Sequence, residues 1–148
     1  MDPVRQHRGD FHWKDVEVLK YKDEGSAPFK DVTRQVLFGD PAFPAQLRYF
    51  EVQPGGWTTL ERHEHVHAVM VIRGKGRVLV GDVSQDIGQN DLVSVPPLTW
   101  HQFQAAGDQP LGFLCMVASE RDKPQLPADH ERDAIARPLR KPGSDPVF

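Results

Sequence analysis

The sequence predicts an all-β domain, built as an antiparallel sandwich or barrel, from two observations. Short runs rich in Val, Leu, Ile and aromatic residues fill the middle of the chain, as expected for strands with a buried face. Turn-forming clusters such as Pro54-Gly55-Gly56 and Gly74-Lys75-Gly76 interrupt these runs at short intervals, and helical periodicity is almost absent. Many short strands at this spacing favour an antiparallel sandwich or barrel over parallel βαβ units.

The length of 148 residues fits one domain with its own core. We divide it into an N-terminal extension at 1–30 with a possible edge strand, a barrel at 31–120 and a Pro- and charge-rich C-terminal tail at 121–148. In that tail Asp129 could cap one short helix, and the rest is expected to be extended. The expected strands are, in order, Val32–Phe38, Leu47–Val52, Ala68–Arg73, Arg77–Val80, Leu92–Val95, Trp100–Gln104 and Leu111–Val117.

Composition excludes several classes of partner. The net charge of -3 offers no basic surface for nucleic acid or an anionic membrane. No run approaches the ~20 apolar residues that a membrane span needs, and the N-terminus has no apolar signal-peptide core. The single cysteine, Cys115, cannot form an internal disulfide. We therefore expect a soluble, cytoplasmic protein with no nucleic-acid or membrane partner.

A cluster of histidines is the most informative segment. His63, His65 and His67 recur at every second position, with Glu61 two residues before the first. Side chains two apart on a strand point to the same face, so such groups come to lie side by side. Imidazoles and a carboxylate are ligands that suit a borderline divalent metal ion, so the segment predicts a metal site.

The spacing within this segment resembles the first motif of the cupin superfamily. That motif runs Gly, five residues, His-x-His, three or four residues, Glu, six residues, Gly. Here Gly55 is followed by Glu61, His63, His67 and Gly74 at those positions. Glu61 replaces the first histidine and His67 replaces the family glutamate, so the ligand types are kept with their positions exchanged.

The second cupin motif is also present at the expected separation. It runs Gly, five residues, Pro-x-Gly, two residues, His, three residues, Asn. In this sequence those positions are Asn90, Pro96, Leu98, His101 and Ala105. The proline and the histidine match, whereas both glycines and the asparagine are replaced. The resemblance implies a jelly-roll barrel, also called a double-stranded β-helix.

The resemblance implies a metal site made of Glu61, His63, His67 and His101. In this register residues 64–66 link two strands, which leaves His65 as a residue of the pocket rim or of the layer behind the ligands. A rival register would pair His63 with His65. It then places an apolar residue, Val69 or Met70, at the carboxylate position, so we favour the first.

The expected cofactor is one divalent transition metal, with Mn or Fe favoured and Ni, Co, Cu or Zn as alternatives. Four protein ligands would leave open positions on a five- or six-coordinate ion, where a small molecule could enter. Glu61 is expected to be catalytic as well as a ligand. Phe103 should face inward with His101, and Trp57 and Trp100 are candidates for the pocket mouth. The apolar interior is expected to contain Val69, Val71 and Leu79.

The family resemblance suggests an oxygenase acting on a small organic molecule. Two alternatives remain open at this point. One is a metal-dependent isomerase or lyase acting on a small sugar-like acid, and the other is a non-catalytic module that binds a metal or small ligand. Cupins of one domain generally pair, so we also expect a homodimer.

Overall fold

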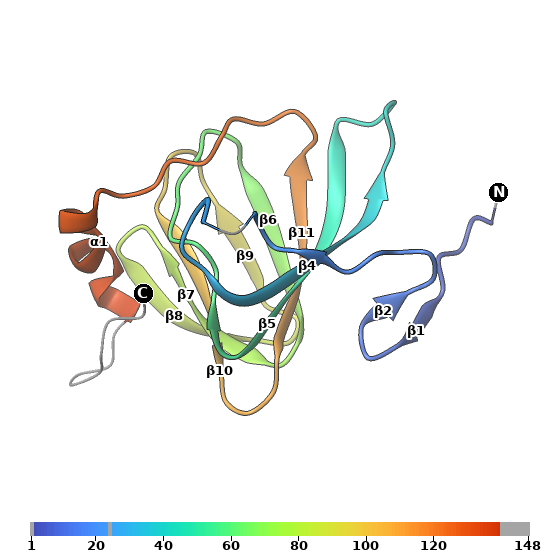
Figure 1. Ribbon diagram of the computed structural model, residues 1–148, viewed down its shortest axis with the longest axis horizontal. Helices are drawn as coiled ribbons and strands as arrows, with labels where there is room; N and C mark the ends of the chain where they lie inside the picture. The colour runs from blue at the N-terminus through green and yellow to red at the C-terminus, as the bar shows by residue number, and fades with distance from the viewer. Residues whose placement is uncertain (1, 24, 140–148) are drawn as a thin grey trace.

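The expected strands are present and curl into an antiparallel barrel of the cupin type (Figure 1). The computed structural model describes residues 2–23 and 25–139. Its elements are β1 (His7–Gly9), β2 (His12–Trp13), β3 (Leu19–Lys20), β4 (Lys30–Gly39), β5 (Ala45–Trp57), β6 (His67–Arg73), β7 (Lys75–Val80), β8 (Val83–Gly88), β9 (Leu92–Val95), β10 (His101–Ala106), β11 (Leu111–Ala118), α1 (Asp129–Ala136) and a 3₁₀ turn at Arg137–Leu139.

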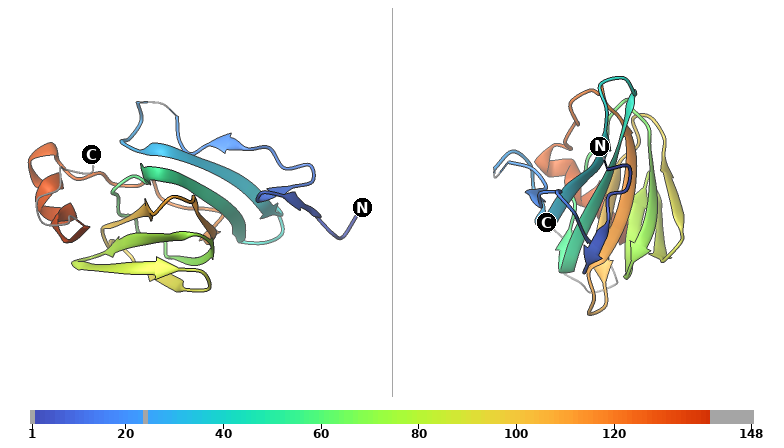
Figure 2. Two further views of the ribbon diagram at one scale, coloured as in Figure 1. Left: turned by 90° about the horizontal axis from the view of Figure 1, so that it is seen from below. Right: turned by 90° about the vertical axis from the view of Figure 1, so that its right-hand side faces the viewer.

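One long sheet forms the barrel wall. Its strands follow the order β8-β7-β10-β5-β11-β6-β9, and β4 adds to it through β5, with β3 paired to β4. The views of Figure 2 show the sheet curling so that β4 and β5 face the layer of β7 and β8. Inward side chains from both layers form the main core, which includes Val52, Val69, Val71, Phe103 and Phe113. The barrel expected from the sequence is therefore confirmed.

Several details differ from the sequence expectation, which did not include the hairpin of β1 and β2. Strand β8 was missed, because only Val83 and Ile87 of its six residues are large and apolar and the strand lies at an edge. Leu79 is buried, but it faces away from the barrel interior. It packs in a second core cluster with Leu60 and Leu139, because neighbouring side chains on β7 point to opposite faces and Val78 occupies the inner one.

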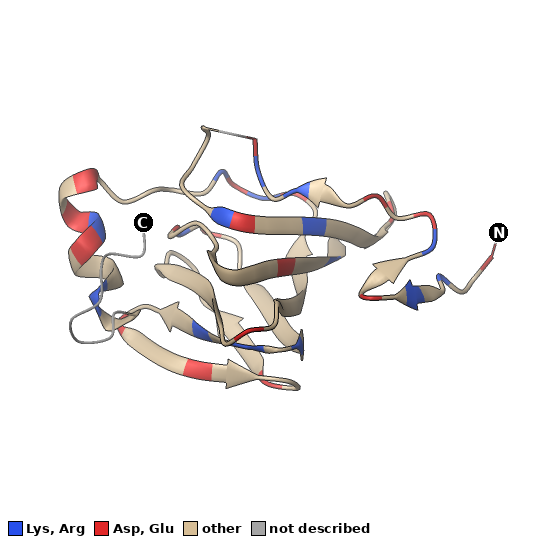
Figure 3. Ribbon diagram, turned by 60° about the horizontal axis from the view of Figure 1, so that its bottom comes forward, with Lys and Arg blue, Asp and Glu red and all other residues tan. Residues whose placement is uncertain are grey.

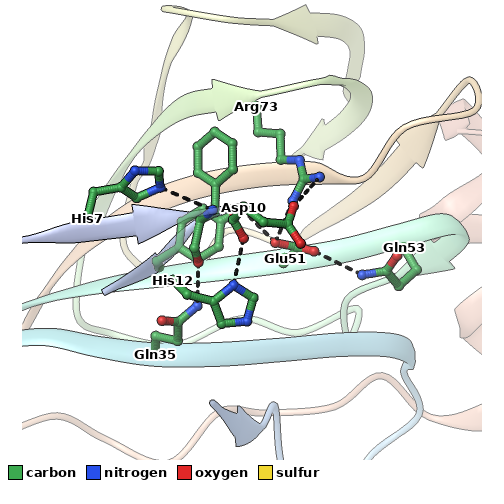
Figure 4. A network of polar contacts seen from close by, with 9 residues as sticks. His7, Asp10, His12, Gln35, Glu51, Gln53 and Arg73 are labelled. Atoms are coloured by element: carbon green, nitrogen blue, oxygen red, sulfur yellow. Dashed lines mark hydrogen bonds and ion pairs between the residues drawn. The ribbon is translucent and has the colours of Figure 1, made fainter. Parts of the chain in front are cut away.

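The N-terminal segment packs on the outer face of the sheet (Figure 4). The ring of Phe11 stacks on that of Tyr49 at 5.6 Å between centroids. Polar contacts hold the segment in place, since Arg73 donates to both Asp10 at 3.0 Å and Glu51 at 3.1 Å. Strand β3 extends the sheet by pairing with β4 of the same chain.

The C-terminal helix α1 closes one side of the barrel. Ala128 is its N-cap, and the amide of Ala128 donates to the side chain of Glu131 at 2.8 Å, so Asp129 is the first helical residue rather than the cap. Three of its eight residues, Asp129, Glu131 and Asp133, are acidic (Figure 3), while Ala136 belongs to the second core cluster and Ile135 packs against it. Residues 140–148 of the expected tail lie outside the described residues. Within the described ranges, no helix combines the length and the hydropathy that spanning a bilayer requires.

Candidate metal centre

Three of the expected ligands meet inside the barrel. The ring nitrogens that His63, His67 and His101 offer all lie within 4.8 Å of one another. His67 begins β6, His101 begins β10, and His63 lies in the segment between β5 and β6. His63 and His101 are buried and His67 is partly buried. Three converging imidazoles are a donor set that suits a divalent transition metal.

Hydrogen bonds leave the same nitrogen free on each ring. Nδ1 of His63 lies 2.7 Å from the carbonyl oxygen of His65, and Nδ1 of His101 lies 2.9 Å from that of Thr99. A carbonyl only accepts, so each Nδ1 donates and Nε2 keeps its lone pair. Nδ1 of His67 contacts the sulfur of Cys115 at 3.3 Å, and among the described residues its buried Nε2 has no partner. A metal ion would satisfy that nitrogen, so the residues present fit the ion.

Burial keeps these imidazoles neutral at physiological pH. It lowers the pKa of His67 to about 2, with further lowering by the charges of His101 and His63. Burial also lowers the pKa of His101 to about 4 and lowers that of His63. Because a histidine binds a metal through its neutral ring, the cluster can take up the ion without first losing protons.

Backbone hydrogen bonds fix the irregular segment that carries Glu61 and His63. The amide of Glu61 donates to the carbonyl of His101 at 3.3 Å, and the amide of His101 donates to the carbonyl of Glu61 at 3.0 Å. The amide of Leu98 donates to the carbonyl of His63 at 2.7 Å. The chain then bends at residues 64–65 before β6 begins, as the expected link requires. Two motifs far apart in sequence are thereby held next to each other.

Two residues that replace cupin glycines keep a glycine-like backbone. Asn90 has φ 73° and Leu98 has φ 53°, both in the left-handed region. Asparagine tolerates this region, whereas a leucine there is strained. The retained Gly74 has φ 67°, and a Cβ at its position would lie 2.1 Å from the carbonyl oxygen of Pro110. The second motif therefore keeps its turns even though its glycines are replaced.

Glu61 faces the same cavity but is paired with a cation. Its carboxylate accepts a hydrogen bond from Nζ of Lys22, and the residue is only 8% exposed. Glu61 is not part of the histidine cluster that could hold the ion. No motif signalled this pair, because 39 residues separate its members. The roles of Glu61 as a fourth ligand and as a catalytic group stay predictions.

His65 lies beside His63 on the cavity wall and outside the histidine cluster. The two rings stack with 3.7 Å between centroids and an interplanar angle of 3°. Nδ1 of His65 lies 2.7 Å from Oδ1 of Asp122. Asp122 also accepts from the amides of Glu64 and His65, and these bonds hold the pKa of its carboxyl well below the usual range. His65 thus packs against His63, and its role as a residue of the pocket rim or of the layer behind the ligands stays a prediction.

The three aromatic residues singled out from the sequence lie in different surroundings. Phe103 is buried and lines the cavity next to the histidines. Trp100 packs instead on the second core cluster, with the guanidinium of Arg62 4.6 Å from its ring centroid. Trp57 ends β5, opposite Gln104. Within the described ranges neither tryptophan is part of the cavity wall, so the geometry does not support their expected place at its mouth.

The cavity also contains basic residues that sequence reasoning missed. It has a volume of about 280 Å³, and Arg34, Arg48 and Arg121 lie on its wall with the histidines. These arginines belong to no motif and are far apart in the sequence. Of the three, only Arg48 could have been noticed in the sequence. On β5 it lies on the same face as the core residues Phe50 and Val52, where an apolar residue is expected.

Comparison with known proteins identifies the family. A family model described as "Cupin domain" matches residues 48–117. A curated protein of Rhodospirillum rubrum, 1-methylthio-D-xylulose 5-phosphate methylsulfurylase, is 53% identical over 127 residues, which cover 86% of this chain and 81% of that protein.

Solved structures of similar sequence agree. The cupin 2 conserved barrel domain protein of Rhodopseudomonas palustris has a TM-score of 0.82 and 48% identity, covering 90% of this chain and 97% of its own. A cupin-2 domain protein of Rhodospirillum rubrum has a TM-score of 0.78 and 49% identity, covering 93% of this chain and 96% of its own.

These comparisons correct the functional expectation. The oxygenase interpretation is wrong, because the curated relative is named as a methylsulfurylase and not as an oxygenase. The assignment as an oxidoreductase of the dioxygenase type is therefore not supported either. A metal-dependent enzyme for a small sugar-like compound, which the sequence left open as an alternative, is closer to that relative.

Proposed function

This chain belongs to the cupin family, and on that basis we propose that it is a metal-dependent methylsulfurylase. Its substrate would be 1-methylthio-D-xylulose 5-phosphate or a ketose phosphate closely similar to it. One observation carries the proposal, namely the 53% identity with the Rhodospirillum rubrum methylsulfurylase along 86% of this chain. A cavity of about 280 Å³ that joins the histidine cluster to basic side chains supports it.

The substrate's chemistry defines what the site must do. A 1-methylthio-2-ketose carries its sulfur on C1, beside the C2 carbonyl. When the C1–S bond breaks and leaves its electron pair on C1, the carbonyl delocalises that charge. A small thiol takes the methylsulfanyl group and forms a methyl disulfide. The thiol proton ends on C1, which becomes a methyl group, so carbon is reduced by two electrons and the two sulfurs are oxidised to a disulfide.

His63, His67 and His101 would hold the ion, through the Nε2 atoms that their other hydrogen bonds leave free. We propose Mn²⁺ or Fe²⁺, because these ions accept more than four ligands and keep open positions beside three histidines. When bound, the ion would act as a Lewis acid that polarises an oxygen of the substrate. The buried rings and the apolar wall at Phe50 and Phe103 limit the water around the reacting atoms.

We assign the proton transfer to Glu61, with Lys22 as the partner that holds its carboxylate. Their hydrogen bond lies on the cavity wall, and the backbone of Glu61 pairs directly with that of His101. A carboxylate in that position can accept the proton of the incoming thiol and return it to C1. Lys22 keeps the carboxylate in place beside the histidines. A thiol acceptor also fits the cytoplasmic location that the sequence led us to expect, because the cytoplasm keeps thiols reduced.

The test is turnover by the full-length chain loaded with Mn²⁺. It would be incubated with synthetic 1-methylthio-D-xylulose 5-phosphate and a small thiol, and followed by ¹H NMR. We expect the S-methyl signal of the substrate to shift to that of a methyl disulfide while a C1 methyl signal grows in equal amount. An unchanged substrate would overturn the proposal, and release of methanethiol with a hydroxyl left on C1 would show hydrolysis instead.

We also propose a homodimer formed through the outer face of β11, β6 and β9. Neighbouring positions of these strands carry Met116, Met70 and Leu92, which are exposed by 55%, 36% and 60%. Exposed apolar side chains that adjoin one another on a flat sheet face are typical of interfaces. A second copy related by a two-fold axis would cover both faces at once.

A further inference from the structure

Three arginines from separate parts of the chain face the cavity. Arg34 lies on β4, Arg48 on β5 and Arg121 in the segment after β11. The sheet register explains how they meet, because β4 and β11 are the two neighbours of β5. Arg34 lies opposite Phe50, which is two positions from Arg48 on β5. Both arginines therefore point to the same face of the sheet. Arg48 in turn lies opposite Cys115 of β11.

No carboxylate among the described residues forms an ion pair with any of these arginines. The two acidic residues on the cavity wall are already engaged. Glu61 binds Lys22, and Asp122 binds His65 together with two backbone amides. The cavity therefore has an excess of positive charge. This repulsion contributes to the lowered pKa of Arg121, which is due first to its burial and then to the nearby charge of Arg48.

Arg34 donates to the carbonyl of Lys20 and Arg121 to those of Ala118 and Ser119, whereas Arg48 packs on an aromatic ring. Its guanidinium carbon lies 4.9 Å from the ring centroid of Phe50, and its buried Nε has no partner among the described residues. Its charge also reaches the ring of His67, whose pKa it helps to lower. A buried donor without a partner costs free energy, and a ligand can recover that cost. Arg48 thus lies on the strand flanked by β4 and β11, close enough to His67 to influence its pKa.

We propose that Arg34, Arg48 and Arg121 form the phosphate subsite of this enzyme and orient a ketose phosphate in the cavity. The inference rests on the proposed function and extends it. Guanidinium groups recognise phosphate oxygens with paired hydrogen bonds, and three of them match a dianionic phosphoester. The phosphate lies at the arginines, so the opposite end of the sugar, with C1 and C2, reaches the histidines. Phosphate recognition therefore sets which carbon reacts.

The test measures binding rather than turnover. The probes are D-xylulose 5-phosphate and D-xylulose, titrated by calorimetry into the full-length chain as purified. Arg34→Gln and Arg121→Gln remove one charge each near the rim of the cavity. Each is expected to weaken D-xylulose 5-phosphate by at least about tenfold, the loss of one charge-assisted hydrogen bond, and to leave D-xylulose unchanged. Arg8→Gln removes an exposed charge on β1 and should change neither.

The outcomes separate this inference from the proposed function. Unaltered binding of D-xylulose 5-phosphate in both variants would overturn the subsite, as would equal weakening of the two probes. A wild-type chain that binds the phosphoester no better than the free sugar would overturn it as well. If the arginine variants behave as expected but 1-methylthio-D-xylulose 5-phosphate is not turned over, the subsite stands and the proposed reaction fails. Arg48→Gln, checked for folding by circular dichroism, should give the largest loss.

Discussion

Replacing His67 and His65 one at a time distinguishes the metal ligands from their supporting residues. His67→Ala removes an Nε2 that converges with those of two other histidines. His65→Ala removes a ring stacked on His63 and its bond to Asp122, but it keeps the backbone carbonyl that receives the proton of His63 Nδ1 at 2.7 Å. Both variants delete a histidine side chain, at positions two residues apart, but they should differ strongly in the metal affinity that is lost.

The magnitude follows from the number of ligands. Zinc peptides with four protein ligands bind their ion with about 10–16 kcal/mol, or roughly 3 kcal/mol for each ligand. That corresponds to a loss of about a hundredfold in affinity for His67→Ala. His65→Ala removes no predicted ligand and keeps the carbonyl that accepts from His63 Nδ1. We therefore expect metal affinity to fall by less than about tenfold.

Calorimetric titration of Mn²⁺ into each full-length variant measures both values. His130→Ala, which removes an exposed histidine on α1, serves as the matched control and should bind as the wild type does. Equal losses in the His65 and His67 variants would refute the register on which the site is built. Unchanged affinity in both would mean that these histidines do not hold the ion.

Three further predictions concern the cavity wall, the second motif and the assembly. Glu61→Gln removes the charge that Lys22 binds and should lower turnover by about a hundredfold. If Glu61 also serves as a fourth ligand, metal affinity falls by at least about tenfold as well, whereas unchanged metal affinity would leave a three-histidine site. Leu98→Gly removes the strain of a leucine held in the left-handed region at φ 53°. Even with the conformational entropy that glycine loses on folding, Tm should rise by about 2–4 °C, and a lower Tm would show that the leucine side chain stabilises the turn. Light scattering should report about 33 kDa, twice the 16.7 kDa of one chain, and a value of one chain would rule out the dimer.

The sequence predicted most of the fold because alternating apolar residues and turn clusters are local signals. Strand β8 was not predicted, because Ser84, Gln85 and Asp86 interrupt the apolar pattern at an edge of the sheet. His63, His67 and His101 could be selected because motif spacing records which positions the fold brings together. The same spacing predicts that His65 is not a ligand, which the His65→Ala titration tests.

The remainder of the site depends on pairings that no local pattern encodes. Lys22 meets Glu61 across 39 residues, and Arg121 reaches the cavity from beyond the last strand. The register of β4 and β5 likewise brings Arg34 and Arg48 to one face of the sheet, and Arg121 follows the other neighbour of β5, strand β11. The error about oxygenase activity has another cause, because one ligand set on one fold serves many reactions. The chemistry therefore had to come from the surroundings of the ion and from comparison.

Turnover as a function of added metal, measured without oxygen, tests the central claim most directly. The full-length chain is stripped of metal with a chelator, and Mn²⁺ is returned stepwise in the presence of 1-methylthio-D-xylulose 5-phosphate and a small thiol. The account predicts that activity rises with metal, reaches its plateau at about one ion per chain and needs no oxygen. Full activity in the stripped protein, or turnover that begins only when oxygen is admitted, would contradict it.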